Sequence, residues 1–385
     1  MTRGGSIKFS GAAPDYLRVT RAARLGYVPA LDGLRGVAIL LVVGRHAFLT
    51  PYNGGYGVDL FFVLSGYLIT TLLLEERDRS ARISLRAFYV RRARRLLPAL
   101  AFMLACYLAA MAAVGHAAVA ARETAAAGFY TANVVQAWWP HVIGRSAIGP
   151  LWSLAQEEQF YLVFPLLLIA MLKWRGETAM RRLVIGGVLL VTIERLALFL
   201  FVYLGSNSQR LYAGPDTHSD GLMLGALLAL TLRRSPGSEA TRADRFLGPA
   251  SALLLGLLTV SSRIPWAVGI SFVNLAAVGL VCATACQPNA PLTRALRWRP
   301  LVGLGKISYS LYLWNALLLF ANHGDAAGDP HYRGTLAAVD VAAAVGVSWL
   351  SYRFVEQRFR RRRDGGTVAV RLRPAPQPVL EQAAQ

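Results

Sequence analysis

The sequence predicts an all-α integral membrane protein, with about ten transmembrane helices in one bundle and both termini cytoplasmic. Of its 385 residues 55% are apolar and only 16% are charged, whereas a soluble domain is nearer to 25% charged. The mean hydropathy is positive, and the apolar residues gather in stretches close to the ~20 residues that a helix needs to cross a bilayer. The composition therefore indicates a multi-pass protein of the inner (plasma) membrane.

An even number of spans places both ends of the chain on one side of the membrane, and the distribution of lysine and arginine predicts which side that is. Of these 41 residues, 33 lie in the two tails and in the connections on the same side as the tails, and only five lie in the opposite connections. Positive charge accumulates on the cytoplasmic side. We therefore expect a cytoplasmic tail over 1–30, a membrane domain over 31–359 and a disordered, Pro-containing basic tail over 360–385. The ten spans are expected at 31–49, 58–74, 96–114, 151–172, 183–204, 218–232, 247–261, 266–286, 303–321 and 335–354.

The net charge of +20 could suit a nucleic-acid-binding protein, but here the basic residues flank apolar spans. Membrane topology and contact with anionic lipid explain this distribution better. We expect membrane lipids and no nucleic acid among the partners, and a homo-oligomer is left open. The three cysteines, Cys106, Cys282 and Cys286, fall in apolar runs with neither a disulfide framework nor zinc spacing, so no metal is expected.

The first span carries two ionisable residues at a spacing that puts them on one helix face. Arg35 and His46 are separated by eleven steps of roughly 100°, which is within about 20° of three full turns, and by about 16 Å along the axis. An ionisable side chain inside a membrane is costly and usually lines a cavity or a reaction path. The simpler alternatives are that His46 lies among headgroups and that Arg35 pairs with Asp32 one turn earlier.

Seven motifs follow one another along the chain. The first is the pair of Arg35 and His46 with ten residues between them. The other motifs are GVDLFFVLSGYLI (57–69), FYVRRARRLLP (88–98), LWSLAQEEQFYLVFPLLL (151–168), DGLMLGALLA (220–229), ISYSLYLWN (307–315) and YRFVEQRF (352–359). Together these motifs resemble the acyltransferase 3 family of membrane enzymes. Two positions depart from the family pattern, since the family usually has His where Asn315 stands and often has Arg where His218 stands.

The resemblance implies an O-acyltransferase that moves a short acyl group, acetyl or propionyl, from acyl-CoA to a hydroxyl of an acceptor. His46 would be the general base, because imidazole with its ordinary pKa near ~6.5 can take the acceptor's proton at neutral pH, and Arg35 would steady the coenzyme. The short chain and its composition are most similar to stand-alone members such as macrolide 3-O-acyltransferases of antibiotic biosynthesis. The alternatives are O-acetylation of an envelope polysaccharide or lipid-linked glycan and, from another class, a membrane transporter or flippase.

The connection before the third span is the candidate acyl-CoA site. A cytoplasmic connection rich in arginine follows from topology alone. Guanidinium groups nevertheless match the geometry of phosphates, and an aromatic side chain beside them can stack on adenine. The coenzyme's phosphates and adenine are therefore expected at Arg86, Arg91, Arg92, Arg94, Arg95 and Tyr89.

Two adjacent carboxylates, Glu157 and Glu158, lie inside the fourth span, where their burial is costly. One of them could orient a residue of the first span, or both could face interfacial water at the outer helix end; both are taken as catalytic candidates. The neighbours Glu194 and Arg195 are expected to pair with each other. The supporting candidates are Asp32, Asp59, Asp220, Trp152 and Tyr309.

Overall fold

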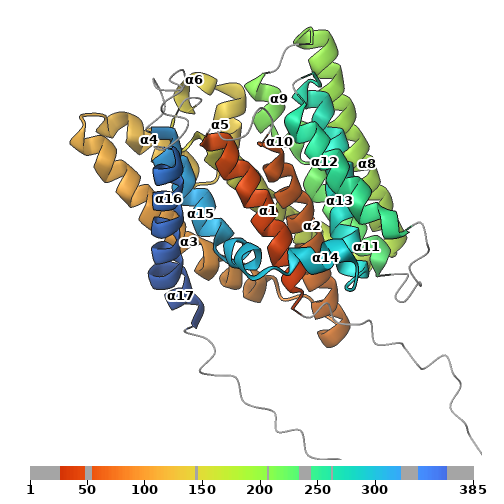
Figure 1. Cartoon of the computed structure of the whole chain (residues 1–385). Coiled ribbons are helices and arrows are strands. Elements are labelled where there is room, and N and C mark those ends of the chain that lie inside the picture. The colour runs from red at the N-terminus through yellow and green to blue at the C-terminus, as the bar shows by residue number, and fades with distance from the viewer. Residues whose placement is uncertain are drawn as a thin grey trace, which may run out of the picture.

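The computed structural model describes residues 27–47, 54–143, 146–205, 208–233, 244–261, 263–321 and 337–361. Within these ranges every regular element is a helix, which confirms the predicted all-α class. Ten helices of at least 13 residues run up and down the bundle, with shorter helices at its two ends (Figure 1).

Each of the ten predicted spans falls on one of these long helices. Six stretches among the described residues are long and apolar enough to cross a membrane, so the protein is a multi-pass membrane protein, while the count of ten crossings stays a prediction. The first helix is not among the six, because its 18 residues include the charged Asp32, Arg35 and Arg45. The ten helices are α1 (Pro29–His46), α2 (Tyr56–Ser80), α3 (Leu85–Ala113), α7 (Trp152–Trp174), α8 (Gly176–Ala197), α11 (Asp220–Leu232), α12 (Asp244–Val260), α13 (Trp266–Cys286), α15 (Arg299–Ala321) and α16 (Ala337–Ser351).

Short elements mark the two ends of the bundle. We call one end the outer end; it carries α4 (Ala117–Gly128), α5 (Ala132–Trp138), α6 (Pro140–Ile143), the turn Gly149–Leu151, α9 (Gln209–Ala213) and α10 (Pro215–His218). The inner end carries α14 (Pro291–Leu296) and α17 (Gln357–Arg361). Two long helices continue as π-helical turns: α8 over Leu198–Val202, before α9, and α16 over Tyr352–Glu356, before α17. The first residues of α1 and the helix α17 both lie at the inner end of the bundle (Figure 1), which is consistent with an even number of crossings.

Glycines bring the central helices into backbone contact. A Cβ on Gly305 of α15 would lie 1.8 Å from the carbonyl oxygen of Asp32 in α1, and one on Gly66 of α2 would lie 1.9 Å from that of Leu222 in α11. Only glycine permits such approaches, which are typical of helix packing in membranes. They fix α1 and α2 in the middle of the bundle, where both contribute to the cavities described below.

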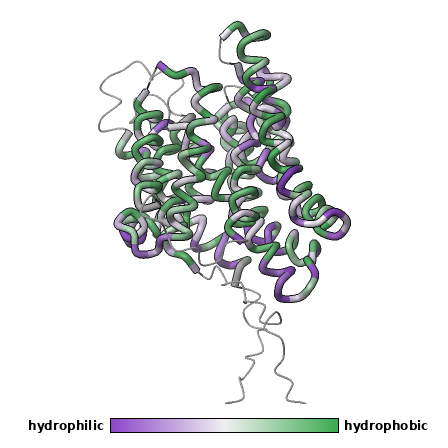
Figure 2. The backbone as a smooth tube through the Cα atoms, turned by 90° about the vertical axis from the view of Figure 1, so that its right-hand side faces the viewer, coloured by the Kyte–Doolittle hydropathy of each residue, from purple (hydrophilic) through white to green (hydrophobic). Residues whose placement is uncertain are grey.

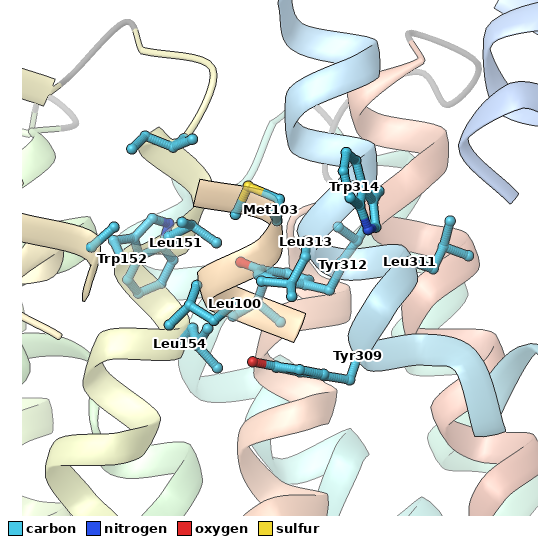
Figure 3. Packing of buried hydrophobic residues seen from close by; sticks show 14 of the residues in the cluster. Leu100, Met103, Leu151, Trp152, Leu154, Tyr309, Leu311, Tyr312, Leu313 and Trp314 are labelled. Carbon is cyan, nitrogen blue, oxygen red and sulfur yellow. The ribbon is translucent and has the colours of Figure 1, made fainter. Parts of the chain in front are cut away.

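The interior and the exterior of the bundle are both apolar. Figure 2 shows hydrophobic residues along the middle of the helices and hydrophilic residues mainly at their ends, and large apolar side chains such as Leu190, Ile193 and Leu253 are exposed on the outside. Lipid contact accounts for that exposure. Inside, α3, α7 and α15 share one buried cluster (Figure 3), which includes Leu100, Met103, Trp152, Leu154, Tyr309 and Tyr312.

The predicted connection over 75–95 is helical for most of its length. Helix α2 continues to Ser80 and α3 already begins at Leu85, with Ser84 as its N-cap: the Ser84 hydroxyl accepts from Ala87 N at 3.3 Å. Leucine, alanine and arginine are strong helix formers, so the helix continues beyond the apolar stretch that hydropathy detects. The arginines of 86–95 therefore lie on regular helix.

Candidate active site

A cavity of about 450 Å³ opens near the outer end of the bundle. His46, at the last position of α1, contributes to its wall. Besides aliphatic residues such as Val42 and Ile270, the wall includes the aromatic and polar residues Arg45, Tyr56, Asp59, Gln136, Trp152, Ser208, Gln209, Tyr212, Trp266 and Tyr312. We call this space the outer cavity.

His46 is held by Asn315 of α15. Its Nδ1 lies 2.5 Å from Asn315 Oδ1, and Asn315 is fully buried. Tyr212 shares the outer cavity but is a poor base: burial first, and then the negative charge of Asp59, raise the pKa of its hydroxyl above the ordinary value, so that it stays protonated. Imidazole is thus the side chain of this wall best suited to take a proton near neutral pH.

A second cavity, of about 720 Å³, lies between α2, α3 and α7 toward the inner end. We call it the inner cavity. Five arginines line it, against three glutamates, so its wall carries an excess of positive charge that suits a phosphorylated ligand. The charged residues are Arg35, Arg79, Arg91, Arg92, Arg95, Glu76, Glu157 and Glu158, and Phe88, Tyr161 and Tyr309 add aromatic rings.

Two of these arginines pair with carboxylates of the same cavity. Arg92 Nη2 lies 2.6 Å from Glu158 Oε1, and its guanidinium carbon lies 3.5 Å from the centre of the Tyr161 ring. Arg91 Nη2 lies 3.2 Å from Glu76 Oε2, and the Arg91 side chain is 51% exposed. The pairs hold both guanidinium groups at the cavity wall without a ligand.

A space of about 50 Å³ separates the two cavities. It shares Arg35, Glu157 and Tyr309 with the inner cavity, and Val58 and Tyr312 with the outer one. This small space, which we call the link, therefore lies between the two cavities and has wall residues in common with both, with the arginines on one side of it and His46 on the other.

At the link, Arg35 contacts Ser308 and not Asp32, the partner considered from the sequence. Its Nη2 and Nε donate to the hydroxyl of Ser308 on α15, at 3.1 and 3.3 Å. Asp32 accepts a hydrogen bond from the Tyr27 hydroxyl at 2.9 Å. The expectation of an Arg35–Asp32 pair is thus wrong, because α15 packs close enough to α1 to supply Ser308.

Glu157 and Glu158 do not orient His46, and they do not cap the outer end of α7. Glu157 accepts hydrogen bonds from the hydroxyls of Ser65 and Tyr161, and Glu158 pairs with Arg92. The orientation of His46 and the capping of α7 are excluded for the same reason: these residues lie more than a turn below the start of α7, on a wall that faces α2 and α3. That Glu157 orients Arg35, with which it lines the inner cavity, stays a prediction.

The six residues expected to bind acyl-CoA divide according to helix face. Arg91, Arg92 and Arg95 line the inner cavity, whereas Arg86 and Arg94 are exposed away from it. Tyr89 also points elsewhere, since its hydroxyl donates to the carbonyl oxygen of Leu162 at 2.9 Å. The lining positions 88, 91, 92 and 95 have the i, i+3, i+4, i+7 spacing of one helix face. With the segment recognised as a helix, this spacing would have identified Phe88 as a further candidate for the wall of the site.

Of the supporting candidates, Asp59 and Trp152 belong to the outer cavity. Asp59 lies 2.8 Å from Nε2 of His218. The Trp152 ring stacks on the His218 ring, with centres 5.2 Å apart. Tyr309 lines the inner cavity, and its hydroxyl donates to the carbonyl oxygen of Leu96 at 2.9 Å.

Asp220 belongs to a buried structural pair outside both cavities. Its two oxygens accept from Nη1 and Nη2 of Arg195 at 2.9 and 2.8 Å, and the remaining guanidinium hydrogens go to Ala267 O, Thr217 O and Ser271 Oγ. The expected Glu194–Arg195 pair is therefore wrong: adjacent residues point about 100° apart on a helix, and Glu194 instead lies 3.5 Å from Arg210.

Comparison with known proteins adds a family and relatives. The family model described as an acyltransferase domain matches residues 28–353. A Staphylococcus aureus (strain COL) protein with a provisional O-acetyltransferase name is 33% identical over 386 residues, which cover 92% of this chain and 60% of that protein. The O-acetyltransferase OatA of the same strain is 32% identical over 371 residues, covering 90% and 60%. The chain thus spans about 60% of the length of these relatives, and no solved structure matches it.

Proposed function

We propose, from the premise that this chain belongs to the acyltransferase 3 family, that it is a membrane O-acyltransferase that moves an acetyl group from acetyl-CoA to a hydroxyl of an envelope glycan. The observation that carries the proposal is the arrangement of the two cavities. An arginine-lined space at the inner end and the His46 space at the outer end lie on either side of the link, whose wall includes Arg35.

In this proposal the inner cavity holds the coenzyme. Arg91, Arg92 and Arg95 bind its phosphates through charge-assisted hydrogen bonds, and Phe88 offers a ring for the adenine. The thioester arm extends outward along α1 past Arg35. The span of about 16 Å from Arg35 to His46 is comparable to the reach of that arm.

The transfer itself needs one base and one leaving group. His46 takes the proton of the acceptor hydroxyl, the hydroxyl oxygen attacks the thioester carbon, and the carbon–sulfur bond breaks. The coenzyme thiolate then takes up the proton and leaves as the thiol. A positioned general base of this kind contributes ~10² to 10⁴ in rate, and no covalent acyl-enzyme is required.

The outer cavity supports a glycan as the acceptor. Its wall includes the aromatic side chains of Trp152, Tyr212 and Trp266 and the amides of Gln136 and Gln209. Rings of this kind contact the apolar faces of sugars, and amides exchange hydrogen bonds with hydroxyls. The relatives' names speak of O-acetylation and not of macrolides, so the macrolide acceptor favoured from the sequence receives no support from them.

The test is transfer of label from acetyl-CoA. Purified protein in detergent is incubated with acetyl-labelled acetyl-CoA and either an oligosaccharide from the producing cell's envelope or a macrolide. We expect a labelled, base-labile ester on the oligosaccharide. Label on the macrolide alone would mean that the acceptor is a macrolide and not a glycan. The absence of both transfer and hydrolysis, with a folded protein, would reject the acyltransferase proposal.

A further inference from the structure

The Asn315 amide on α15 contacts His46 on α1 in one orientation, with its oxygen toward the imidazole. Its Nδ2 donates to the carbonyl oxygens of Leu311 and Tyr312, both at 2.7 Å. Only Oδ1 is left to face His46, whose Nδ1 lies 2.5 Å away. Turning the amide over would place Oδ1 against two carbonyl oxygens, so the neighbouring backbone determines which amide atom His46 meets.

This orientation has a chemical consequence for the imidazole. An amide oxygen only accepts hydrogen bonds, so Nδ1 of His46 must carry a hydrogen. Neutral imidazole has one hydrogen on its two nitrogens, and its lone pair therefore lies on Nε2. We propose that Asn315 is a positioning residue that fixes this tautomer and so makes Nε2 the atom that takes the acceptor's proton. The inference rests on the proposed function for its catalytic meaning.

The contact persists through the reaction. After Nε2 has taken a proton, the imidazolium still donates its Nδ1 hydrogen to Asn315, and the amide dipole stabilises the new charge. Asparagine does not titrate itself. A histidine at 315, as in the family pattern, could accept from His46 only while one of its own nitrogens is unprotonated. It would therefore add a second titration that asparagine avoids.

Other charged groups near His46 are the same in all variants compared below, so differences between variants report on position 315. Asp59, for instance, is paired with His218. The titratable side chains that line the outer cavity with His46 are Arg45 on its own helix, Tyr56 and Asp59 on α2, Tyr212 on α9 and Tyr312 on α15.

The tautomer is measured first, by nitrogen-15 NMR of histidine-labelled protein in detergent, with the His46 signals assigned by their loss in His46→Gln. We expect hydrogen on Nδ1 in the wild type at alkaline pH and loss of this preference in Asn315→Leu. Hydrogen on Nε2 in the wild type would overturn the proposal. This measurement needs no acyl transfer, so it stands even if the proposed function fails.

The pH profile of transfer is measured second, with thermal unfolding checked for each variant. Asn315→Leu should lose on the order of 10- to 100-fold in kcat, with little change in either KM. Asn315→His should recover much of that kcat at alkaline pH, and its acid limb should steepen from one proton toward two. Wild-type kcat in folded Asn315→Leu, or an acid limb that stays at one proton in Asn315→His, would overturn the positioning role.

Discussion

His218 Nε2 lies 2.8 Å from Asp59 Oδ1, while His218 Nδ1 lies 2.6 Å from the carbonyl oxygen of Tyr212. An ionised Asp59 and the Tyr212 carbonyl oxygen are both acceptors, so each ring nitrogen of His218 has an acceptor to which it can donate. The pair is almost fully buried, with 1% and 3% of the two side chains exposed. An arginine at this position would also donate to Asp59, which accounts physically for one departure from the family pattern.

This relationship predicts opposite results for two substitutions of His218. His218→Leu removes the donors and leaves the buried Asp59 carboxylate without its partner, at a cost of about 3–5 kcal/mol. His218→Arg keeps donors opposite Asp59 and should cost much less. Thermal unfolding in detergent checks both, with Asp59→Leu/His218→Leu as the control that restores part of the loss. Equal melting temperatures for the Leu and Arg variants would contradict this role of the pair.

His46→Gln tests the general base. Glutamine is close in size and hydrogen bonding to neutral imidazole but takes up no proton at neutral pH. Transfer at saturating donor should fall by ~10² to 10⁴, while acetyl-CoA still binds, because its phosphates are assigned to arginines of the inner cavity. Near wild-type turnover in a folded variant would move the search for the base elsewhere.

The arginines of α3 offer a matched comparison within one segment. Replacing Arg91 and Arg95, which line the inner cavity, with Gln should raise the KM for acetyl-CoA. Each lost charge-assisted contact should reduce the binding free energy of the coenzyme by on the order of 1.5 to 3 kcal/mol. Replacing the exposed Arg86 and Arg94 with Gln removes the same charge and should change this KM little. Equal effects of the two pairs would reduce the role of the segment to membrane topology.

Arg35→Lys and Ser308→Ala test the link between the cavities. Lysine keeps the charge but not the planar fork, so we expect a raised donor KM and a smaller loss in kcat. Ser308→Ala removes the hydroxyl that Arg35 contacts at 3.1 Å and should shift the same constants in the same direction, more weakly. Initial rates over a donor series measure both. A loss confined to the acceptor KM would argue against donor handling by Arg35.

The orientation of the bundle is tested with single cysteines in a chain whose three native cysteines are replaced. Position 80, at the end of α2, and position 289, before α14, lie at the inner end, whereas position 115, between α3 and α4, lies at the outer end. Impermeant thiol reagents added to intact cells should label 115 and spare 80 and 289. Labelling at 80 would reverse the predicted orientation.

Periodicity predicted the parts of this protein that depend on one helix at a time. The spans follow from apolar length, and eleven residues between Arg35 and His46 suffice to place both on one face of α1. The partners of these two residues could not be predicted, because Ser308 and Asn315 lie about 270 residues away and meet α1 through the packing of α15 against it. Hydropathy also placed the start of α3 too late in the chain, because it detects where the apolar stretch begins and not where the helix begins.

In the proposed reaction the coenzyme stays on the inner side of the link, and only the acyl group goes beyond it. Moving one elementary charge across 100 mV involves ~2.3 kcal/mol, and the proposed binding to the inner arginines would keep the phosphates of the coenzyme out of the electric field of the membrane. In the proposed reaction an acyl group leaves outward and the hydrogen of the hydroxyl returns inward on the thiol. The exchange is electrically neutral, so the transfer needs neither a membrane potential nor an ion gradient, and the thioester alone supplies its driving force.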